Sequence, residues 1–155
     1  MEQQEAAPHP TGQDDNEAAH PHHLRVTIVT GDRMVYDGLA DRVIAPAING
    51  QISVLPRHAP LLATLEPGEM VVRLGDYVEA MAVGGGFIEV LDDQVTVLAD
   101  TAERAEEIDT ARAEAARQRA RALMQMYRDR PEYAAAYQAM RRSRARLKVA
   151  SRMVK

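Results

Sequence analysis

The residue chemistry of this chain changes completely at Asp100, and this change limits the folds that are open to it. Before Asp100, short apolar runs rich in β-branched residues alternate with turn residues. The runs at 87–90 and 95–98 flank a polar turn at Asp92-Asp93, which predicts a β-hairpin. After Asp100 there is no glycine, and alanine and arginine dominate, as is typical of helices. The sequence therefore predicts a β module joined directly to a helical module.

The two modules carry opposite charge. Residues 1–100 contain 16 acidic and 5 basic side chains, a net charge of −11, whereas residues 101–155 contain 7 acidic and 14 basic side chains, a net charge of +7. We therefore expect the helical module to meet acidic partners. The chain has no cysteine, which excludes disulfides and thiolate metal sites. No apolar run approaches the roughly 20 residues of a membrane-spanning helix.

Residues 1–23 are polar and contain almost no large apolar side chain, so they cannot bury enough surface to offset the entropy lost on ordering. We predict a disordered tail there. The cluster of His20, His22 and His23 in this tail has side chains that can bind a metal, but it lacks organised neighbours and we assign it no function.

The β module is predicted over residues 24–100. Turn signals include Asn49-Gly50, which favours a short hairpin, and Pro67-Gly68, which favours a type II turn. Three consecutive glycines at 84–86 suggest a bulge or a close backbone approach rather than a phosphate loop. The expected strands lie at 24–30, 34–36, 41–45, 51–55, 61–65, 70–74, 77–83, 87–90 and 95–98. Many short strands with regular turns predict a sandwich or barrel.

The helical module is predicted over residues 101–155 as an antiparallel hairpin of two helices. Asp100 and Glu103 form a possible capping pair, and Asp109 is a good N-cap before the run 110–124. Pro131 suits the first turn of the second helix. Two stripes of small residues would face each other, namely Ala113, Ala116 and Ala120 against Ala136, Ser143 and Ala150. Because small side chains bury little area, this hairpin should be marginally stable unless it docks on another surface.

Arginines are the most informative polar residues. Arg112 and Arg119 fall on one face of the first helix, and Arg142 and Arg146 fall on one face of the second. A hairpin that brought these four together would suit a polyphosphate. The alternative is a solvated basic face paired with nearby glutamates, and spacing alone leaves both open. Catalytic patterns are missing from the sequence; His58, between two prolines, is expected to serve a turn or surface contact.

Several stretches occur in an order and spacing that resemble one family. They are LPRHAPL at 55–61 followed by Pro67-Gly68, then VGGGF at 83–87, VTVLAD at 95–100 and IDTARA at 108–113. Together they make the chain similar to the epsilon subunits of bacterial F-type ATP synthases over residues 24–149. This resemblance implies a β-sandwich of about ten strands followed by a two-helix domain.

The resemblance also implies function and partners. The chain would be a non-catalytic rotor subunit that couples proton flow to ATP synthesis on the cytoplasmic face of the bacterial plasma membrane. Its sandwich would bind the gamma subunit and the c-ring, so it would meet the membrane only through the complex. The mobile helices would inhibit ATP hydrolysis by reaching the acidic C-terminal region of a beta subunit, which suits their positive charge. A nucleic-acid-binding module remains an alternative, and a small β-sandwich enzyme is a third class.

Two sets of site residues follow from the resemblance. No cofactor is required, but ATP is a possible regulatory ligand of the folded hairpin, at Glu103, Ile108, Asp109, Arg112, Ala113, Arg119, Arg142 and Arg146. The c-ring surface is expected at Asn49, Gly50, Gln51, Arg57 and His58. Arg57 and Gln51 depart from the residues common in the family, a glycine and an acidic residue respectively.

Overall fold

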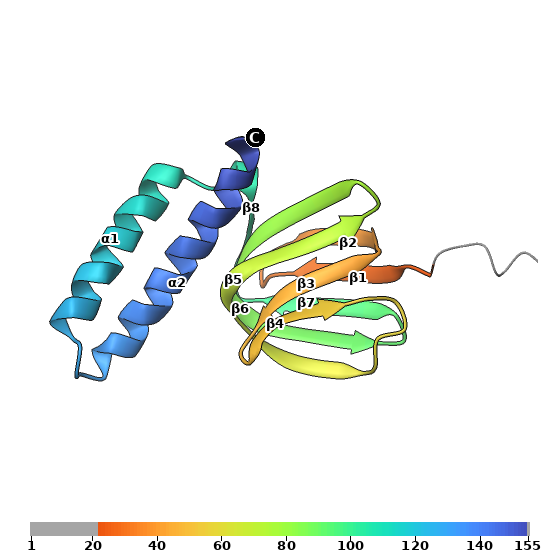
Figure 1. Cartoon of the computed structure of the whole chain (residues 1–155), viewed down its shortest axis with the longest axis horizontal. Helices are drawn as coiled ribbons and strands as arrows, with labels where there is room; N and C mark the ends of the chain where they lie inside the picture. Colours follow the sequence, from red (N-terminus) through yellow and green to blue (C-terminus); the bar gives the residue numbers. More distant parts are fainter. Residues whose placement is uncertain (1–21, 155) are drawn as a thin grey trace, which may run out of the picture.

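Strands precede helices in the computed structural model, which describes residues 22–154 (Figure 1). The strands are β1 Leu24–Val29, β2 Met34–Ala40, β3 Arg42–Ala47, β4 Gly50–Val54, β5 Leu61–Leu74, β6 Tyr77–Leu91, β7 Gln94–Ala99 and β8 Ala102–Arg104. The helices are α1 Thr110–Met126 and α2 Glu132–Ser151, with short 3₁₀ turns η1 Ala105–Glu107 and η2 Arg152–Val154. Most of the predicted disordered tail, 1–23, lies outside the described residues.

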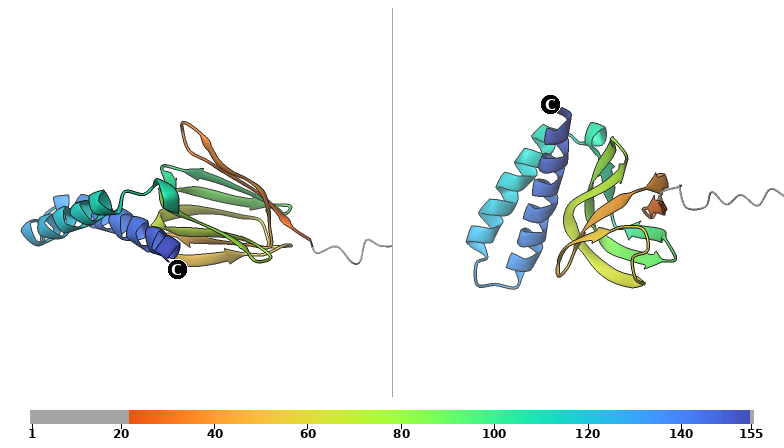
Figure 2. Two further views of the ribbon diagram at one scale, coloured as in Figure 1. Left: turned by 90° about the horizontal axis from the view of Figure 1, so that it is seen from above. Right: turned by 45° about the vertical axis from the view of Figure 1, so that its right-hand side comes forward.

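The strands form one sheet in the order β2-β1-β7-β6-β5-β3-β4, with β8 paired to β6. The β1–β7 pair is parallel, and all other described pairs are antiparallel. The sheet folds over on itself, as the two views in Figure 2 show. It encloses one apolar core. Within β7, buried and more exposed residues alternate, which is the pattern of a strand with one face on a core. The predicted β-sandwich is confirmed.

The strand count differs from the prediction, because the described residues form eight strands and not ten. The expected strands 61–65 and 70–74 are joined in β5, and those at 77–83 and 87–90 are joined in β6. Pro67 and Gly68 make no turn; they pair with Gly84 and Val83 in a register that runs unbroken along β5 and β6. The β3–β5 register is interrupted opposite Pro67, where a proline that donates no hydrogen bond is tolerated.

The three glycines of β6 lie where neighbouring atoms come close, and at Gly86 these atoms belong to another backbone, as predicted. At Gly84, an added Cβ would lie 2.1 Å from Thr101 Oγ1. At Gly86, where φ is +122°, it would lie 2.1 Å from the carbonyl oxygen of Leu98 in the neighbouring strand. Side chains at these positions would push β6 away from the chain that pairs with it.

Two predicted hairpins are present. Asp92 and Asp93 connect β6 to β7 with φ values of 49° and 60°, which is the backbone of a tight two-residue turn. The hairpin between β3 and β4 has Ile48 and Asn49 as its loop residues, because Ala47 pairs with Gly50. Of the expected Asn49-Gly50 pair, only Gly50 has a positive φ, 116°.

The helical hairpin begins later than expected. Residues 102–104, which we assigned to the helical module, form β8 and extend the sheet, so Asp100 and Glu103 do not cap a helix. Asp109 does cap α1, since its carboxylate accepts a hydrogen bond from the backbone N–H of Arg112 at 3.0 Å. Pro131 stands at the start of α2, as predicted. In Figures 1 and 2, α2 lies between α1 and the sandwich.

Small residues line the contact between the two helices, as expected. Five of the six expected residues are buried, namely Ala113, Ala120, Ala136, Ser143 and Ala150, whereas Ala116 is half-buried. Ser143 remains compatible with this position because its hydroxyl donates to the carbonyl of Ala139, one turn earlier, at 2.9 Å.

Candidate functional site

A cavity of about 300 Å³ opens where α1 begins, between the helices and the end of the sheet. It is lined by residues of β8, η1, both helices and the linker before α1: Glu103, Glu107, Ile108, Asp109, Arg112, Ala113, Ala116, Arg119 and Arg146. Seven of the eight residues expected to hold ATP are in this set. The exception is Arg142.

The first turn of α1 positions one wall of this cavity. The Asp109 carboxylate accepts a hydrogen bond from the backbone N–H of Arg112 and so fixes where α1 begins. This fixes the position of the Arg112 side chain in the first turn. Arg119 lies two turns further along the same face. Ala113, the residue after Arg112, also lines the cavity; it is 3% exposed, and its small side chain leaves room there.

The opposite wall of the cavity is formed by residues of α2 and of β8 in the sheet. Arg146 Nε of α2 donates to Glu103 Oε2 of β8 at 2.6 Å. Among the described residues, the side chains of Arg112 and Arg119 have no ion-pair partner. Two guanidinium groups are therefore available to a ligand, and a third is available if Glu103 exchanges its partner. Planar guanidinium groups bind phosphate oxygens in pairs, and the nearby carboxylates accept hydrogen bonds from amino or hydroxyl groups.

Glu107 was not among the expected site residues, but it lines the cavity. Its carboxylate accepts two hydrogen bonds from Arg33, at 2.5 and 3.0 Å, and one from the backbone N–H of Arg104 at 2.7 Å. The Arg33 guanidinium, followed by the hydrogen bond from Arg104, holds the pKa of Glu107 below its ordinary value. Arg33 lies in the turn between β1 and β2, so this pair ties the linker before α1 to the sandwich.

Arg142 does not join the other three arginines. A methyl group added at Gly84 would lie 3.8 Å from Cδ of Arg142, which places this side chain beside β6. Three of the four arginines expected to meet therefore line the cavity. The basic groups of the cavity are thus Arg112, Arg119 and Arg146.

The residues expected at the c-ring fall into two groups at opposite ends of β4. Gly50 and Gln51, next to Asn49 in the β3–β4 hairpin, line a cavity of about 590 Å³ beside α2. Arg57 lies beyond the other end of β4, where its backbone N–H donates to Asp93 at 2.6 Å. His58 is beside it, with Nδ1 2.7 Å from the carbonyl oxygen of Ala59.

His22 and His23, the described part of the histidine cluster, contact separate residues. His22 Nε2 lies 2.9 Å from a guanidinium nitrogen of Arg57, and His23 Nδ1 lies 2.9 Å from Asp41. No group of three His, Asp or Glu side chains within residues 22–154 is placed to hold a metal ion. Within the same residues, neither helix has the length and hydropathy of a membrane span.

A second set of charged residues joins α2 to β5 and was missed by the sequence analysis. Arg141 pairs with Glu66, and Lys148 and Arg152 both pair with Glu69. The three cations are spaced seven and four apart, which places them on one face of a helix. The acids, however, flank the Pro67-Gly68 pair that we interpreted as a turn, so they were not expected to face α2.

Comparison with known proteins decides the family. The family model described as "ATP synthase, Delta/Epsilon chain, beta-sandwich domain" matches residues 23–105, and that described as "ATP synthase, Delta/Epsilon chain, long alpha-helix domain" matches residues 106–151. The ATP synthase epsilon chain of Acidithiobacillus ferridurans is 47% identical over 130 residues, which cover 84% of this chain and 92% of that one.

The chain belongs to the ATP synthase epsilon family. The epsilon chain of Syntrophobacter fumaroxidans is similar to it as well, at 44% identity over 129 residues, covering 83% of this chain and 96% of the relative. A chain in the cryo-EM structure of the Euglena gracilis mitochondrial ATP synthase, which comprises OSCP, F1 and the c-ring, shares the fold. Its TM-score is 0.73 at 23% identity, with 94% of this chain and 90% of that chain covered.

Membership of the epsilon family confirms the resemblance seen in the sequence. It assigns the chain to the ATP synthase, a membrane-associated complex in which its named relatives are epsilon chains. The nucleic-acid-binding alternative finds no support in these matches. Neither does the β-sandwich enzyme, because the relatives are named as a chain of the synthase.

Proposed function

We propose that this epsilon-family chain is a non-catalytic rotor subunit in the central stalk of a proton-translocating ATP synthase. Its sandwich binds the gamma subunit and the c-ring on the cytoplasmic face of a bacterial plasma membrane. Its helical hairpin leaves the sandwich and reaches the acidic C-terminal region of a beta subunit, where it inhibits ATP hydrolysis. The charge of +7 on residues 101–155 supports an acidic partner for the helices.

The folded hairpin binds ATP in the cavity at the start of α1. One observation carries this part of the proposal: Arg112 and Arg119 of α1 and Arg146 of α2 line the same cavity. The triphosphate contacts these guanidinium groups, while Asp109 and Glu103 accept hydrogen bonds from the amino or hydroxyl groups of the nucleotide.

ATP then acts as a regulatory ligand. The cavity exists only while α1, α2 and β8 are together, because each contributes lining residues. ATP therefore stabilises the docked hairpin by RT ln(1 + [L]/Kd), about 2.7 kcal/mol when ATP is in hundredfold excess over Kd. Binding of ATP shifts the population away from the inhibitory conformation.

Isothermal titration calorimetry on the full chain tests the ATP site. The wild type should bind ATP, and Arg112→Ala should weaken binding by at least tenfold, as expected for the loss of a charge-assisted contact of about 1.5–3 kcal/mol. Arg130→Ala removes the same charge from the exposed loop between the helices, outside the cavity, and should leave binding unchanged. Heats equal to dilution in the wild type would refute the site.

Inhibition is tested separately with an enzyme core of alpha, beta and gamma subunits. Addition of the full chain should lower the rate of ATP hydrolysis, and a chain truncated after residue 108 should bind the core without inhibiting it. An unchanged rate, under conditions where binding of the full chain to the core is demonstrated, would contradict the inhibitory role.

A further inference from the structure

The contact between α2 and the sandwich contains little apolar surface. Its buried residues are Ala82 of β6 and Ala145 and Val149 of α2, with Ala80 and Ile108 packed at the edges. Alanine side chains remove little area from water, and buried area sets the hydrophobic contribution, about 25 cal/mol per Å². Apolar packing alone therefore holds α2 weakly.

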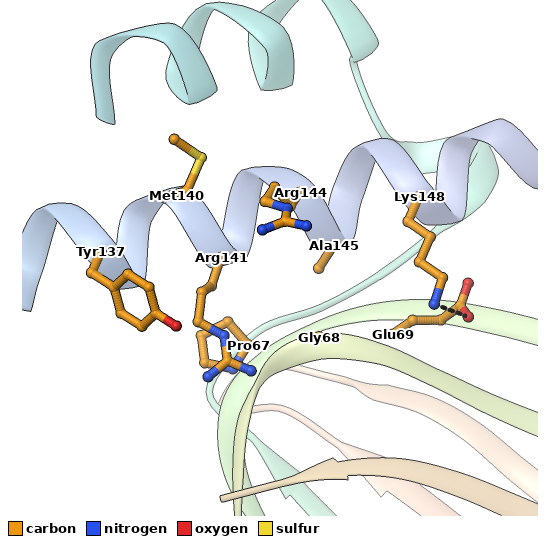
Figure 3. Close-up of a pocket in the computed structure, with 9 residues that line it drawn as sticks. All are labelled: Pro67, Gly68, Glu69, Tyr137, Met140, Arg141, Arg144, Ala145 and Lys148. Atoms are coloured by element: carbon orange, nitrogen blue, oxygen red, sulfur yellow. Dashed lines mark ion pairs between the residues drawn. The ribbon is translucent and has the colours of Figure 1, made fainter. Parts of the chain in front are cut away.

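Ion pairs surround this small apolar contact. The side chain of Glu69 is only 8% exposed, and its carboxylate accepts two hydrogen bonds from Arg152, at 2.6 and 2.8 Å. Lys148 Nζ lies 3.4 Å from the same carboxylate. Figure 3 shows Lys148 extending from α2 toward Glu69 on β5, with Arg141 reaching down beside Pro67. Arg141 also pairs with Glu66, whose side chain is 24% exposed.

Because Glu69 is largely buried, the docking of α2 on the sandwich and the ion pairs of Glu69 depend on each other. A glutamate whose side chain is 8% exposed needs its partners, because a largely buried charge without a counter-charge is costly. If α2 moves away as a unit, Glu69 gains water at the same moment that it loses Arg152 and Lys148. The carboxylate is thus paired in one state and hydrated in the other, and neither state leaves it buried and alone.

We infer that Glu66 and Glu69 form an ionic latch with Arg141, Lys148 and Arg152, and that this latch sets the fraction of chains whose helices are docked on the sandwich. The latch rests on the proposed function in one respect, namely that the helices can leave the sandwich. It is separate from the ATP cavity, since none of its five residues lines that cavity. The latch and the ATP cavity would therefore act on the same movement through different residues.

The docked fraction can be measured by single-molecule energy transfer in the full chain. Because the chain has no cysteine, Ser53→Cys on β4 and Ala135→Cys on α2, both exposed in the docked structure, provide unique sites for a donor and an acceptor dye. The wild type should show a high-transfer docked population whose share falls as NaCl rises from about 20 to about 500 mM, since screening weakens ion pairs.

The variant Glu69→Gln should raise the ratio of undocked to docked chains at low salt by about tenfold and flatten the salt dependence. Arg152 is the first residue of η2, directly after α2 and away from the sandwich core. Arg152→Gln should shift the ratio in the same direction, which would show that the effect of Glu69→Gln is not a folding defect. Glu114→Gln is the matched control, because the partners of Glu114 within residues 22–154 are Arg117 and Gln118 of its own helix.

The outcomes separate the latch from the proposed function. Salt-dependent undocking that is the same in the wild type, Glu69→Gln and Arg152→Gln would overturn the latch and leave the mobile helices intact. One high-transfer population at every salt concentration would overturn both the latch and the mobile helices.

Discussion

Gly86 should be the glycine least tolerant of substitution by alanine among those with positive φ. Its φ of +122° is a backbone conformation that costs a residue with a Cβ about 1–3 kcal/mol. The new methyl carbon would also lie 2.1 Å from the Leu98 carbonyl oxygen and 2.9 Å from Ala99 Cα. Both atoms belong to backbone that cannot rotate away, so β7 must move. Overpacking of this kind costs a further 1–3 kcal/mol or so.

The sum for Gly86→Ala is a loss of about 4 kcal/mol in the free energy of unfolding, a large part of the roughly 5–15 kcal/mol of a typical domain. Two other glycines separate the contributions. Gly75 has φ of +57° and no atom within 4 Å of the added Cβ, so Gly75→Ala should cost only the strain, about 1 kcal/mol. Gly31 has ordinary φ and open space, so Gly31→Ala should change stability by less than about 0.5 kcal/mol.

Urea unfolding followed by circular dichroism measures all three variants, with the slope m checked for equality before midpoints are compared. The order of destabilisation should be Gly86, then Gly75, then Gly31. If Gly86→Ala were no less stable than Gly75→Ala, β7 could move without a loss in the free energy of unfolding. The argument from close backbone approach would then fail.

Three further predictions concern the helices. Asp109→Ala should destabilise α1 by about 1 kcal/mol through loss of its cap, whereas Asp109→Ser should not, and equal melting of the two by circular dichroism would contradict the capping role. Val149→Ala, at a residue with 0% exposure, should weaken docking of α2 by about 1.5 kcal/mol in the energy-transfer assay; an unchanged ratio would exclude its packing role. The Arg152 guanidinium, more than any other group, holds the pKa of Glu69 below its ordinary value of 4.5. Docking by this pair should therefore be fully present above that value and decline as pH falls through the lower folded pKa, so a loss between about pH 7 and 5 would contradict it.

Local patterns predicted the elements that depend on local interactions. The Asp92-Asp93 hairpin, the Asp109 cap and the position of Pro131 each depend on residues within one turn of chain, and each is present. Pro67-Gly68 carries an equally strong local signal and was misinterpreted. Its conformation is decided by pairing with Gly84 and Val83 and by the gap in the β3–β5 register, neither of which is visible in a local pattern.

In the candidate site, too, local features were predicted and those that depend on distant residues were not. Spacing along α1 correctly placed Arg112 and Arg119 on one face, but it could not give the position of α2 along its axis relative to α1. Arg142 and Arg146 are four residues apart, so they differ in height by about 6 Å, and only the second reaches the cavity. Glu107 was missed because its partner, Arg33, lies 74 residues earlier in the chain.

The linker between β8 and α1 restricts how far the helices can travel. Only residues 105–109 separate the last strand from the first helix, and three of them form η1. Even if η1 unwound completely, the six virtual bonds from 104 to 110 would span at most about 20 Å. The first residue of α1 is therefore tethered near the rim of the sandwich. A reach much beyond that distance requires α1 to swing about this tether, or α2 to separate from α1 and continue outward along the same line.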